Sequence, residues 1–251
     1  MNDRPLLEVR GITKSFGSVQ ALTDVDFTAT AGEVMALVGD NGAGKSTLIK
    51  CIAGIHGYDD GEIYFDGKPV HIHGPKDSAK LGIEIVYQDL ALCDNLDVVQ
   101  NMYLGREIHD WLFRLKESAM EQSTASTLKS LAVTTIRSIR QPVASLSGGQ
   151  RQSVAVAKAV QWNSRLVILD EPTAGVDFEL RMELWRYIRR LHSEGTTILL
   201  TTHYLEEAEE LCDEIALIRG GHLIARDSAD GLRRHYGAAT LADVYLKAMS
   251  V

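Results

Sequence analysis

A glycine-rich stretch near the N-terminus has the residue types needed to hold a phosphate group. It fits the pattern G-x-x-x-x-G-K-[ST], in which backbone N–H groups and the start of a helix surround phosphate oxygens. We expect Lys45 to contact the β- and γ-phosphates of a nucleotide and the Ser46 hydroxyl to bind magnesium. An exposed glycine turn is the disfavoured alternative, because a buried strand precedes the stretch and a helix follows it. The residues are Gly39, Asp40, Asn41, Gly42, Ala43, Gly44, Lys45, Ser46 and Thr47.

Two adjacent carboxylates follow another apolar run. Asp170 and Glu171 come directly after Leu166–Leu169, and Pro172 ends the segment. We expect Asp170 to hold Mg²⁺ through water at the carboxyl end of a strand. Glu171 would lie closer to the γ-phosphate and act as the general base for the attacking water. An exposed acidic turn is the alternative, and it is disfavoured in a chain that already has a phosphate loop.

A third stretch offers a second anion site. Ser147 and the glycines after it stand where a helix is predicted to begin, so they would expose N–H groups and the positive end of a helix dipole. The phosphate loop does not need such a site in the same chain. The stretch consists of Leu146, Ser147, Gly148, Gly149 and Gln150.

Several strands and helices must position these residues. The β-type runs Leu6–Arg10, Val25–Thr28 and Val34–Val38 predict an antiparallel N-terminal sheet. Val34–Val38 also leads into the phosphate loop and a helix from Lys45, which is the strand-loop-helix order of an α/β nucleotide domain. From about residue 96 to about residue 145 the chain is predicted to be mostly helical, as an inserted subdomain. Further elements are expected at Ile63–Phe65, Ile83–Val86, from near Gly149, and at Phe178–His192, Thr197–Thr201, Ile215–Ile218, Leu223–Ala225 and Thr240–Met249.

Composition limits the classes of protein that remain. The 251 residues include 26 basic and 34 acidic side chains, and the net charge of −8 argues against a general affinity for nucleic acid. Cys51, Cys93 and Cys212 are scattered, so neither a disulfide framework nor a zinc site is indicated, and a reducing cytoplasm fits best. We find no secretory signal and no apolar run of membrane-spanning length. A role at a membrane would therefore require another chain to span it.

Taken together, these motifs make the chain similar to the nucleotide-binding subunits of ABC transporters over essentially its whole length. The resemblance implies an α/β fold of the ABC ATPase type: a P-loop NTPase core with an N-terminal antiparallel β subdomain and an inserted helical subdomain. It implies a single domain over residues 1–251, with the ATP-binding core at 1–95 and 163–251 and the helical subdomain with the LSGGQ motif at about 96–162. In this family the LSGGQ motif closes over the ATP of a second subunit.

Four more positions take roles from the resemblance. Phe16 matches the aromatic residue that stacks on adenine, where many members have tyrosine; a core phenylalanine is the alternative. Gln88 matches the glutamine that touches magnesium and water and links ATP to the membrane subunit, or it is a solvated loop residue. Asp177 matches an aspartate at the dimer contact and would also cap the helix from Phe178. His203 matches the histidine that contacts the γ-phosphate and helps to orient Glu171 and water.

The implied cofactor is Mg²⁺, with ATP as the substrate of hydrolysis. The implied partners are a second ATPase subunit, expected to be identical, transmembrane permease subunits, and a solute-binding protein if the transporter is an importer; nucleic acid is not expected. The location implied is the cytoplasmic face of the cell membrane, reached through the membrane subunits.

The two parts of the sequence resemble transporters of opposite direction. Residues up to about 173 resemble the ATPases of simple-sugar importers, and residues from about 174 resemble those of ABC-2-type exporters, which suggests a natural or constructed recombinant. We favour monosaccharide import, because the family's contacts to the membrane subunit lie on the importer-like side. Export of a drug or polysaccharide is the alternative. A soluble ABC ATPase of DNA repair or ribosomes is disfavoured, because the chain has neither a long coiled coil nor tandem domains.

Three other features are interpreted more simply. His71 and His73 could form a metal pair but have no apparent third ligand, so we predict surface histidines. Trp111 and Phe113 could face a membrane partner or fill a small core, and both alternatives stay open. The acidic run Glu206–Glu210 is predicted to be a solvated helix face.

Overall fold

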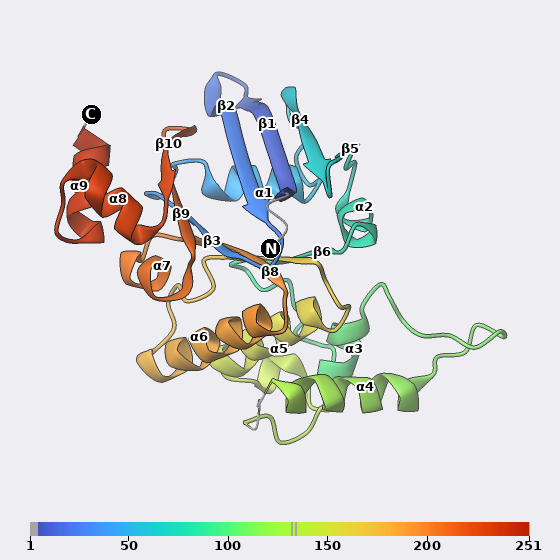
Figure 1. The fold of residues 1–251 in the computed structure, drawn as a ribbon. Coiled ribbons are helices and arrows are strands. Elements are labelled where there is room, and N and C mark those ends of the chain that lie inside the picture. The colour runs from blue at the N-terminus through green and yellow to red at the C-terminus, as the bar shows by residue number, and fades with distance from the viewer. Residues whose placement is uncertain (1–4, 132, 134, 251) are drawn as a thin grey trace.

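The computed structural model describes residues 5–131, 133 and 135–250, and Figure 1 shows the fold. The elements are, in chain order, β1 (Pro5–Phe16), β2 (Val19–Thr30), β3 (Val34–Val38), α1 (Lys45–Ile52), β4 (Asp60–Phe65), β5 (Lys68–Val70), α2 (Pro75–Lys80), β6 (Ile83–Val86), α3 (Val98–Tyr103), α4 (Glu117–Ser130), a 3-10 turn (Val143–Ser145), α5 (Gly148–Val160), β7 (Leu166–Asp170), α6 (Phe178–Ser193), β8 (Thr197–Thr202), α7 (Leu205–Leu211), β9 (Glu214–Arg219), β10 (His222–Asp227), α8 (Ala229–Tyr236) and α9 (Leu241–Ser250).

A six-stranded sheet forms the centre of the molecule. Its order is β10-β9-β3-β8-β7-β6, in which β10 pairs antiparallel with β9 and the other neighbours are parallel. Every residue of β3, β7 and β8 is buried, which explains their continuous apolar sequences, since helices or a second sheet cover both faces of such strands. The carboxyl ends of β3, β7 and β8 therefore meet at one edge, where the phosphate loop, Glu171 and His203 follow.

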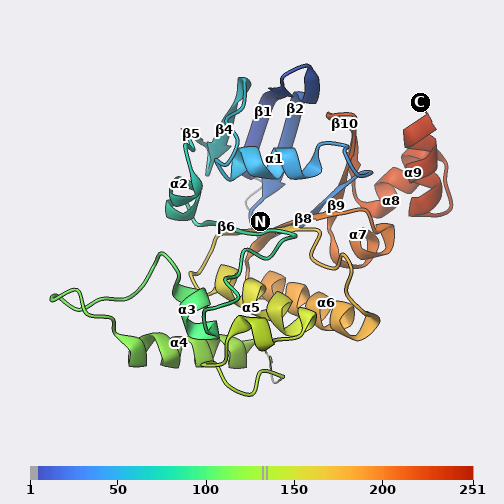
Figure 2. The same ribbon diagram turned by 180° about the vertical axis from the view of Figure 1, so that it is seen from behind.

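A separate four-stranded antiparallel sheet has the order β2-β1-β4-β5. This confirms the predicted N-terminal antiparallel sheet but corrects its membership, because Val34–Val38 is β3 and belongs to the parallel sheet. A strand without polar alternation suits a position buried on both faces. The first two strands are also longer than predicted, with 12 residues each, and their antiparallel pairing continues past the apolar stretches to Phe16 and Val19. Figure 2 shows α1 lying against this upper sheet.

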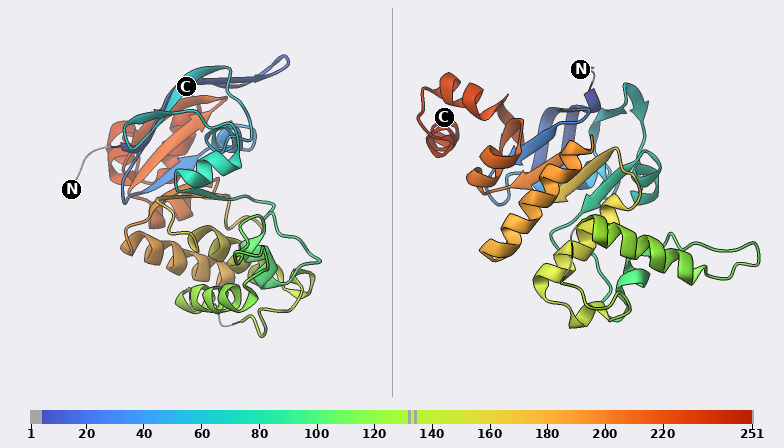
Figure 3. Two further views of the ribbon diagram at one scale, coloured as in Figure 1. Left: turned by 90° about the vertical axis from the view of Figure 1, so that its right-hand side faces the viewer. Right: turned by 60° about the horizontal axis from the view of Figure 1, so that its bottom comes forward.

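The helices α3, α4 and α5 pack together around a cluster of their own that includes Val98, Met102 and Val154. The prediction of a mostly helical segment at 96–145 is only partly right, because residues 104–116 form a hairpin-like loop with a bridge between His109 and Leu115. The Asp110 carboxylate causes this turn by accepting hydrogen bonds from the N–H groups of Leu112 and Arg114 at 2.8 and 2.9 Å. The loop extends away from the rest of the molecule (Figures 1 and 3).

The C-terminal helices pack against the central sheet on the side of β3 and β9. α7, α8 and α9 contribute to one apolar cluster with β3 and β9, to which Leu232, Leu241 and Val244 belong. The predicted hairpin at 215–225 is β9-β10, and the predicted tail helix is α9. Among the described helices, none combines the length and the apolar character needed to cross a bilayer.

Candidate active site

The phosphate loop connects the buried end of β3 to α1. Gly44 precedes the first helical residue with φ of 109°, and a Cβ there would lie 2.9 Å from the Ala21 carbonyl oxygen, so both backbone conformation and space require glycine. The Lys45 ammonium is 4 % exposed and donates to the carbonyl oxygens of Gly39 at 2.7 Å and Asp40 at 3.2 Å. The loop thus holds the lysine charge within its own curve.

The Glu171 carboxylate lies between two nitrogen groups. Its Oε1 is 3.2 Å from Lys45 Nζ, and its Oε2 is 3.2 Å from His203 Nδ1. Its backbone has φ of 50°, and its N–H is fixed by the carbonyl oxygen and the hydroxyl of Thr201 at 3.1 and 3.0 Å. The structure therefore joins, from three separate parts of the chain, the lysine, acid and histidine that the sequence singled out.

Asp170 and Ser46 provide two oxygens at the same edge. Ser46 Oγ donates to Asp170 Oδ1 at 3.2 Å, and the Thr201 hydroxyl donates to the same oxygen at 2.6 Å. Asp170 is 4 % exposed. A pair of protein oxygens beside a phosphate loop suits Mg²⁺, which takes few protein ligands and completes its octahedron with phosphate oxygens and water. The donor set therefore fits the predicted cofactor.

Gln88 and Phe16 lie at the periphery of this edge. Gln88 is exposed after β6, and it makes no side-chain hydrogen bond to the described residues. Its neighbour Tyr87 is partly buried near Asp170, and burial together with the Asp170 charge raises the pKa of the Tyr87 hydroxyl to about 12. Phe16 is 45 % exposed at the end of β1, with its ring 5.1 Å from the His56 ring. This exposure excludes a core position for Phe16, and the Lys14 ammonium lies 5.4 Å from the centre of the ring.

The LSGGQ stretch begins α5, as predicted. Ser147 caps the helix by accepting from Gln150 N–H at 3.3 Å, while the Gln150 side chain accepts from Ser147 N–H at 2.9 Å. A Cβ on Gly149 would lie 2.8 Å from Leu180 of α6, so glycine allows the two helices to approach. In the described part of the chain no hydrogen bond or ion pair connects Leu146 through Gln150 with the phosphate loop.

Asp177 stands at the start of α6. Its carboxylate accepts from Leu180 N–H at 2.9 Å, so it caps this helix, and the side chain is exposed. The helix-capping function is therefore observed, whereas the dimer contact stays a prediction.

Two contacts of this region were not predicted from the sequence. Tyr245 of α9 donates to Asp40 Oδ1 of the phosphate loop at 2.7 Å, although 205 positions separate the two residues. Thr201, which fixes both Asp170 and Glu171, lies within a buried apolar strand. The sequence signal for Thr201 is a threonine at the carboxyl end of one buried strand, because the acidic pair follows another buried strand of the same sheet. No feature of the tail sequence indicates the contact between Tyr245 and the phosphate loop.

The structure also locates the histidine pair, the two aromatic residues and the acidic run named in the sequence. His71 and His73 are exposed, and the described residues contain no group of three or more histidine, cysteine or acidic side chains that could hold a metal. Trp111 and Phe113 are 85 % and 87 % exposed, which excludes a small core. The acidic run is not a uniform solvated face, because Glu207 is 1 % exposed.

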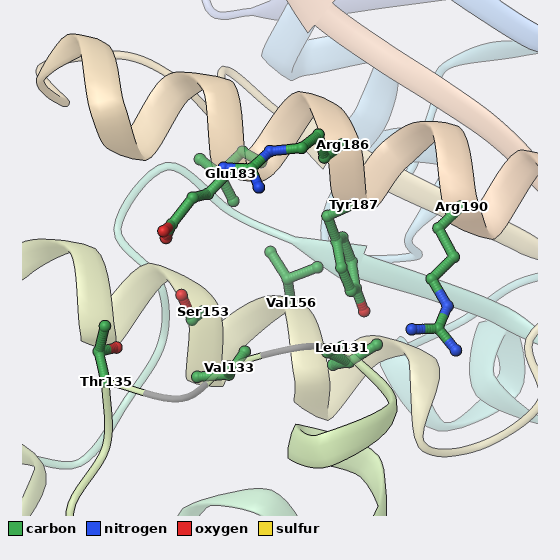
Figure 4. Close-up of a pocket in the computed structure, with 10 residues that line it drawn as sticks. Leu131, Val133, Thr135, Ser153, Val156, Glu183, Arg186, Tyr187 and Arg190 are labelled. Atoms are coloured by element: carbon green, nitrogen blue, oxygen red, sulfur yellow. The ribbon is translucent and has the colours of Figure 1, made fainter.

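A cavity of about 210 Å³ lies away from this edge, between α5 and α6. Figure 4 shows Val156 and Tyr187 on facing helices beside it, with Arg186 and Arg190 along α6. None of the predicted site residues lines this cavity.

Residues 22–174 match the family model described as ABC transporter. The chain belongs to this family. This membership confirms that the chain is an ATP-binding subunit of the ABC type, as its motifs predicted.

Relatives with sugar import in their names match most of this ABC transporter chain. It is 43% identical over 219 residues to the xylose/arabinose import ATP-binding protein of Sulfolobus acidocaldarius, covering 87% of this chain and 86% of that one. It is 41% identical over 227 residues to the fructose import ATP-binding protein of Rhizobium meliloti, covering 88% and 87%. It spans only 46% of a ribose import ATP-binding protein of Rubrobacter xylanophilus, to which it is 42% identical.

Solved structures confirm the ABC ATPase fold. A structure of an ATP-binding subunit of an ABC transporter has a TM-score of 0.81 at 29% identity, covering 97% of this chain and 99% of that one. An ATP-binding cassette of an ABC transporter in its ADP conformation has a TM-score of 0.80 at 25% identity, with the same coverage.

The predicted recombinant origin gains no support from these relatives. A ribose import ATP-binding protein of Yersinia pestis is 39% identical over 253 residues and covers 98% of this chain. The similarity to sugar import proteins therefore continues well beyond residue 174, into the part that was expected to resemble exporters.

Proposed function

We propose that this chain hydrolyses ATP to power the import of a monosaccharide through a membrane permease. The observation that carries the ATPase assignment is the Glu171 carboxylate, held 3.2 Å from both Lys45 and His203 and next to the Asp170–Ser46 pair. The assignment to sugar import rests on the relatives named for xylose/arabinose, fructose and ribose import.

In the proposed reaction, Lys45 exchanges its carbonyl acceptors for phosphate oxygens of ATP, and the N–H groups of the loop bind the same phosphates. Glu171 accepts a proton from the attacking water, and His203 orients that water and contacts the γ-phosphate. Ser46 and Asp170, with Gln88, would hold Mg²⁺, and the ion would supply positive charge beside the phosphates. Phe16 stacks on adenine with its exposed ring.

We propose that the working unit is a dimer with ATP at the subunit interface. Ser147 and Gly148 are exposed at the start of α5, and in the described part of the chain no hydrogen bond connects them with the phosphate loop. The Gly148 N–H and the positive end of the helix dipole would face the ATP of a second subunit, and the Ser147 N–H could join them by leaving the Gln150 side chain. Leu146, Gly149 and Gln150 complete the motif at this helix start, and Asp177, exposed at the start of α6, would contact the same second subunit. The ATPase rate per subunit should therefore rise with protein concentration, and a constant rate from a proven monomer would overturn the dimer.

The permease contact is assigned to the Gln88 loop and to the helical subdomain at about 96–162. Both Gln88 and the aromatic tip of the 104–116 loop are exposed. Attachment to permease subunits would place the chain at the cytoplasmic face of the membrane, and an importer would also use a separate solute-binding protein.

Uptake of labelled monosaccharides tests the proposed function. Cells in which Glu171→Gln replaces the parent chain should lose uptake of one sugar among xylose, arabinose, fructose and ribose, while the level of the protein is unchanged. The exposed substitution Glu206→Gln serves as the matched control. Unchanged uptake of every sugar in a broader monosaccharide panel would contradict sugar import.

A further inference from the structure

A single acidic side chain of α7 is turned into the protein. Glu206, Glu209 and Glu210 are exposed, and ion pairs with Arg233 and Arg189 hold the last two outward. Glu207 is 1 % exposed, because it shares its helix face with the buried Ala208 and Leu211. A buried carboxyl group is rare unless it has partners, so its surroundings require an explanation.

Four polar groups surround this carboxyl. Trp185 Nε1 of α6 donates to Glu207 Oε1 at 3.1 Å. Burial raises the pKa of the Glu207 carboxyl, and the Thr202 and Thr173 hydroxyls, the Trp185 N–H and the Arg181 charge each act to lower that pKa, so all four lie close to it. The carboxyl thus connects α7 with α6, with the end of β8 and with the segment after β7.

Three atoms of this cluster complement one another. Thr173 Oγ1, Arg181 Nε and Glu207 Oε2 are buried, and within the described structure none of them has a hydrogen-bond partner. Two of these groups can donate and the third accepts. Buried polar groups are nearly always paired, so the cluster can form further hydrogen bonds after a small movement of the three elements.

The cluster lies directly behind the hydrolytic residues. Thr173 stands between Glu171 and Asp177, and Thr202 immediately precedes His203. The Arg181 guanidinium lies 5.0 Å from the centre of the Tyr204 ring, which is 4.1 Å from the His203 ring. Each polar group of the cluster is therefore on or next to a segment that carries a residue of the proposed ATP site.

We propose that Glu207 is a positioning residue, whose hydrogen bond from Trp185 and close approach to Thr173 and Thr202 hold the Glu171 and His203 segments in the alignment that hydrolysis requires. This inference rests on the proposed ATPase function of the same site. Glu207 does not itself reach ATP, so its loss should lower kcat and leave the KM for ATP nearly unchanged. An error of about 1 Å in the placement of reacting groups can cost on the order of a hundredfold in rate.

The test measures kcat and KM for Mg·ATP, together with thermal stability, in the purified full chain. Glu207→Ala should lower kcat by about tenfold to a hundredfold with KM within about twofold. Glu207→Gln should retain kcat within about threefold, since its amide oxygen still accepts from Trp185 and its NH₂ group can bond the threonine hydroxyls. Thr173→Val, which keeps the shape and removes the hydroxyl, should also lower kcat, and it covers the case in which Glu207→Ala does not fold. Glu206→Gln is the exposed control on the same helix.

The outcomes separate this inference from the proposed function. A parent chain without ATPase activity at any protein concentration would contradict the proposed function itself. With an active parent, the inference is overturned if folded Glu207→Ala and Thr173→Val both keep the parent kcat. It is equally overturned if Glu207→Gln loses as much activity as Glu207→Ala, because the hydrogen bonds would then not account for the effect.

Discussion

Replacing Glu171 by glutamine separates ATP binding from hydrolysis more sharply than any other single change. The side chain is only 10 % exposed, and its two oxygens face Lys45 and His203 at 3.2 Å each. Glutamine keeps the size and the planar head group, so the packing around the site should be retained. It loses the negative charge and the ability to take a proton from water.

The size of the effect follows from these two losses. Removal of a general base usually slows a reaction by about 10²–10⁴-fold, which is a rise in the activation barrier of about 2.7–5.4 kcal/mol. The charge that disappears lies beside the place where the anionic phosphates bind, so repulsion of ATP decreases and Lys45 is released from its ion pair. We therefore expect ATP affinity to be equal or higher in the variant.

The assay compares phosphate release at saturating Mg·ATP with equilibrium ATP binding in the parent, Glu171→Gln and the control Glu206→Gln. The control removes one exposed carboxylate of α7 and should leave both quantities unchanged. Turnover of Glu171→Gln within about threefold of the parent would refute the role of Glu171 as general base.

Three other predictions follow from contacts in the structure. Lys45→Ala should weaken ATP binding by about tenfold to a hundredfold, because a hydrogen bond to a charged group contributes about 1.5–3 kcal/mol. Lys50→Ala, on the same helix, should leave the affinity for ATP unchanged. Calorimetric titration of both variants with ATP checks this. Tyr245→Phe removes the hydrogen bond to Asp40 and should lower the free energy of unfolding by about 0.5–1 kcal/mol in urea titrations, and identical curves would show that this bond contributes nothing. Burial raises the pKa of the Glu207 carboxyl in the folded chain, so the folded state binds that proton more tightly than the unfolded state does. The free energy of unfolding should therefore fall as pH rises above about 4, the ordinary pKa of a glutamate. In thermal melts Glu207→Gln should lose less stability than the parent over this pH range, and equal losses would contradict burial as the cause.

Most of the site could be predicted because its residues lie in short motifs next to buried strands. Lys45, Asp170 and Glu171 follow strands of the parallel sheet or begin the helix after one, and parallel strands bring such positions to one edge. The sequence could not show that Tyr245 reaches Asp40, because that contact depends on how α9 packs in the folded chain.

The errors have definite physical causes. The position of Val34–Val38 after two antiparallel strands predicts the same sheet for it, whereas its continuous apolar sequence suits the observed strand buried on both faces. The segment 104–116 was expected to be helical, but hydrogen bonds to the Asp110 carboxylate favour a turn. The acidic run predicts a solvated position for Glu207 as well, because composition alone does not reveal which side of a short helix faces the core.

Co-purification from membranes tests the central claim most directly. The tagged full chain, isolated from its own cells in mild detergent and analysed by mass spectrometry, should recover a permease of the monosaccharide import type together with a second ATPase subunit. Recovery of an ABC-2-type export permease as the only membrane partner would contradict the account.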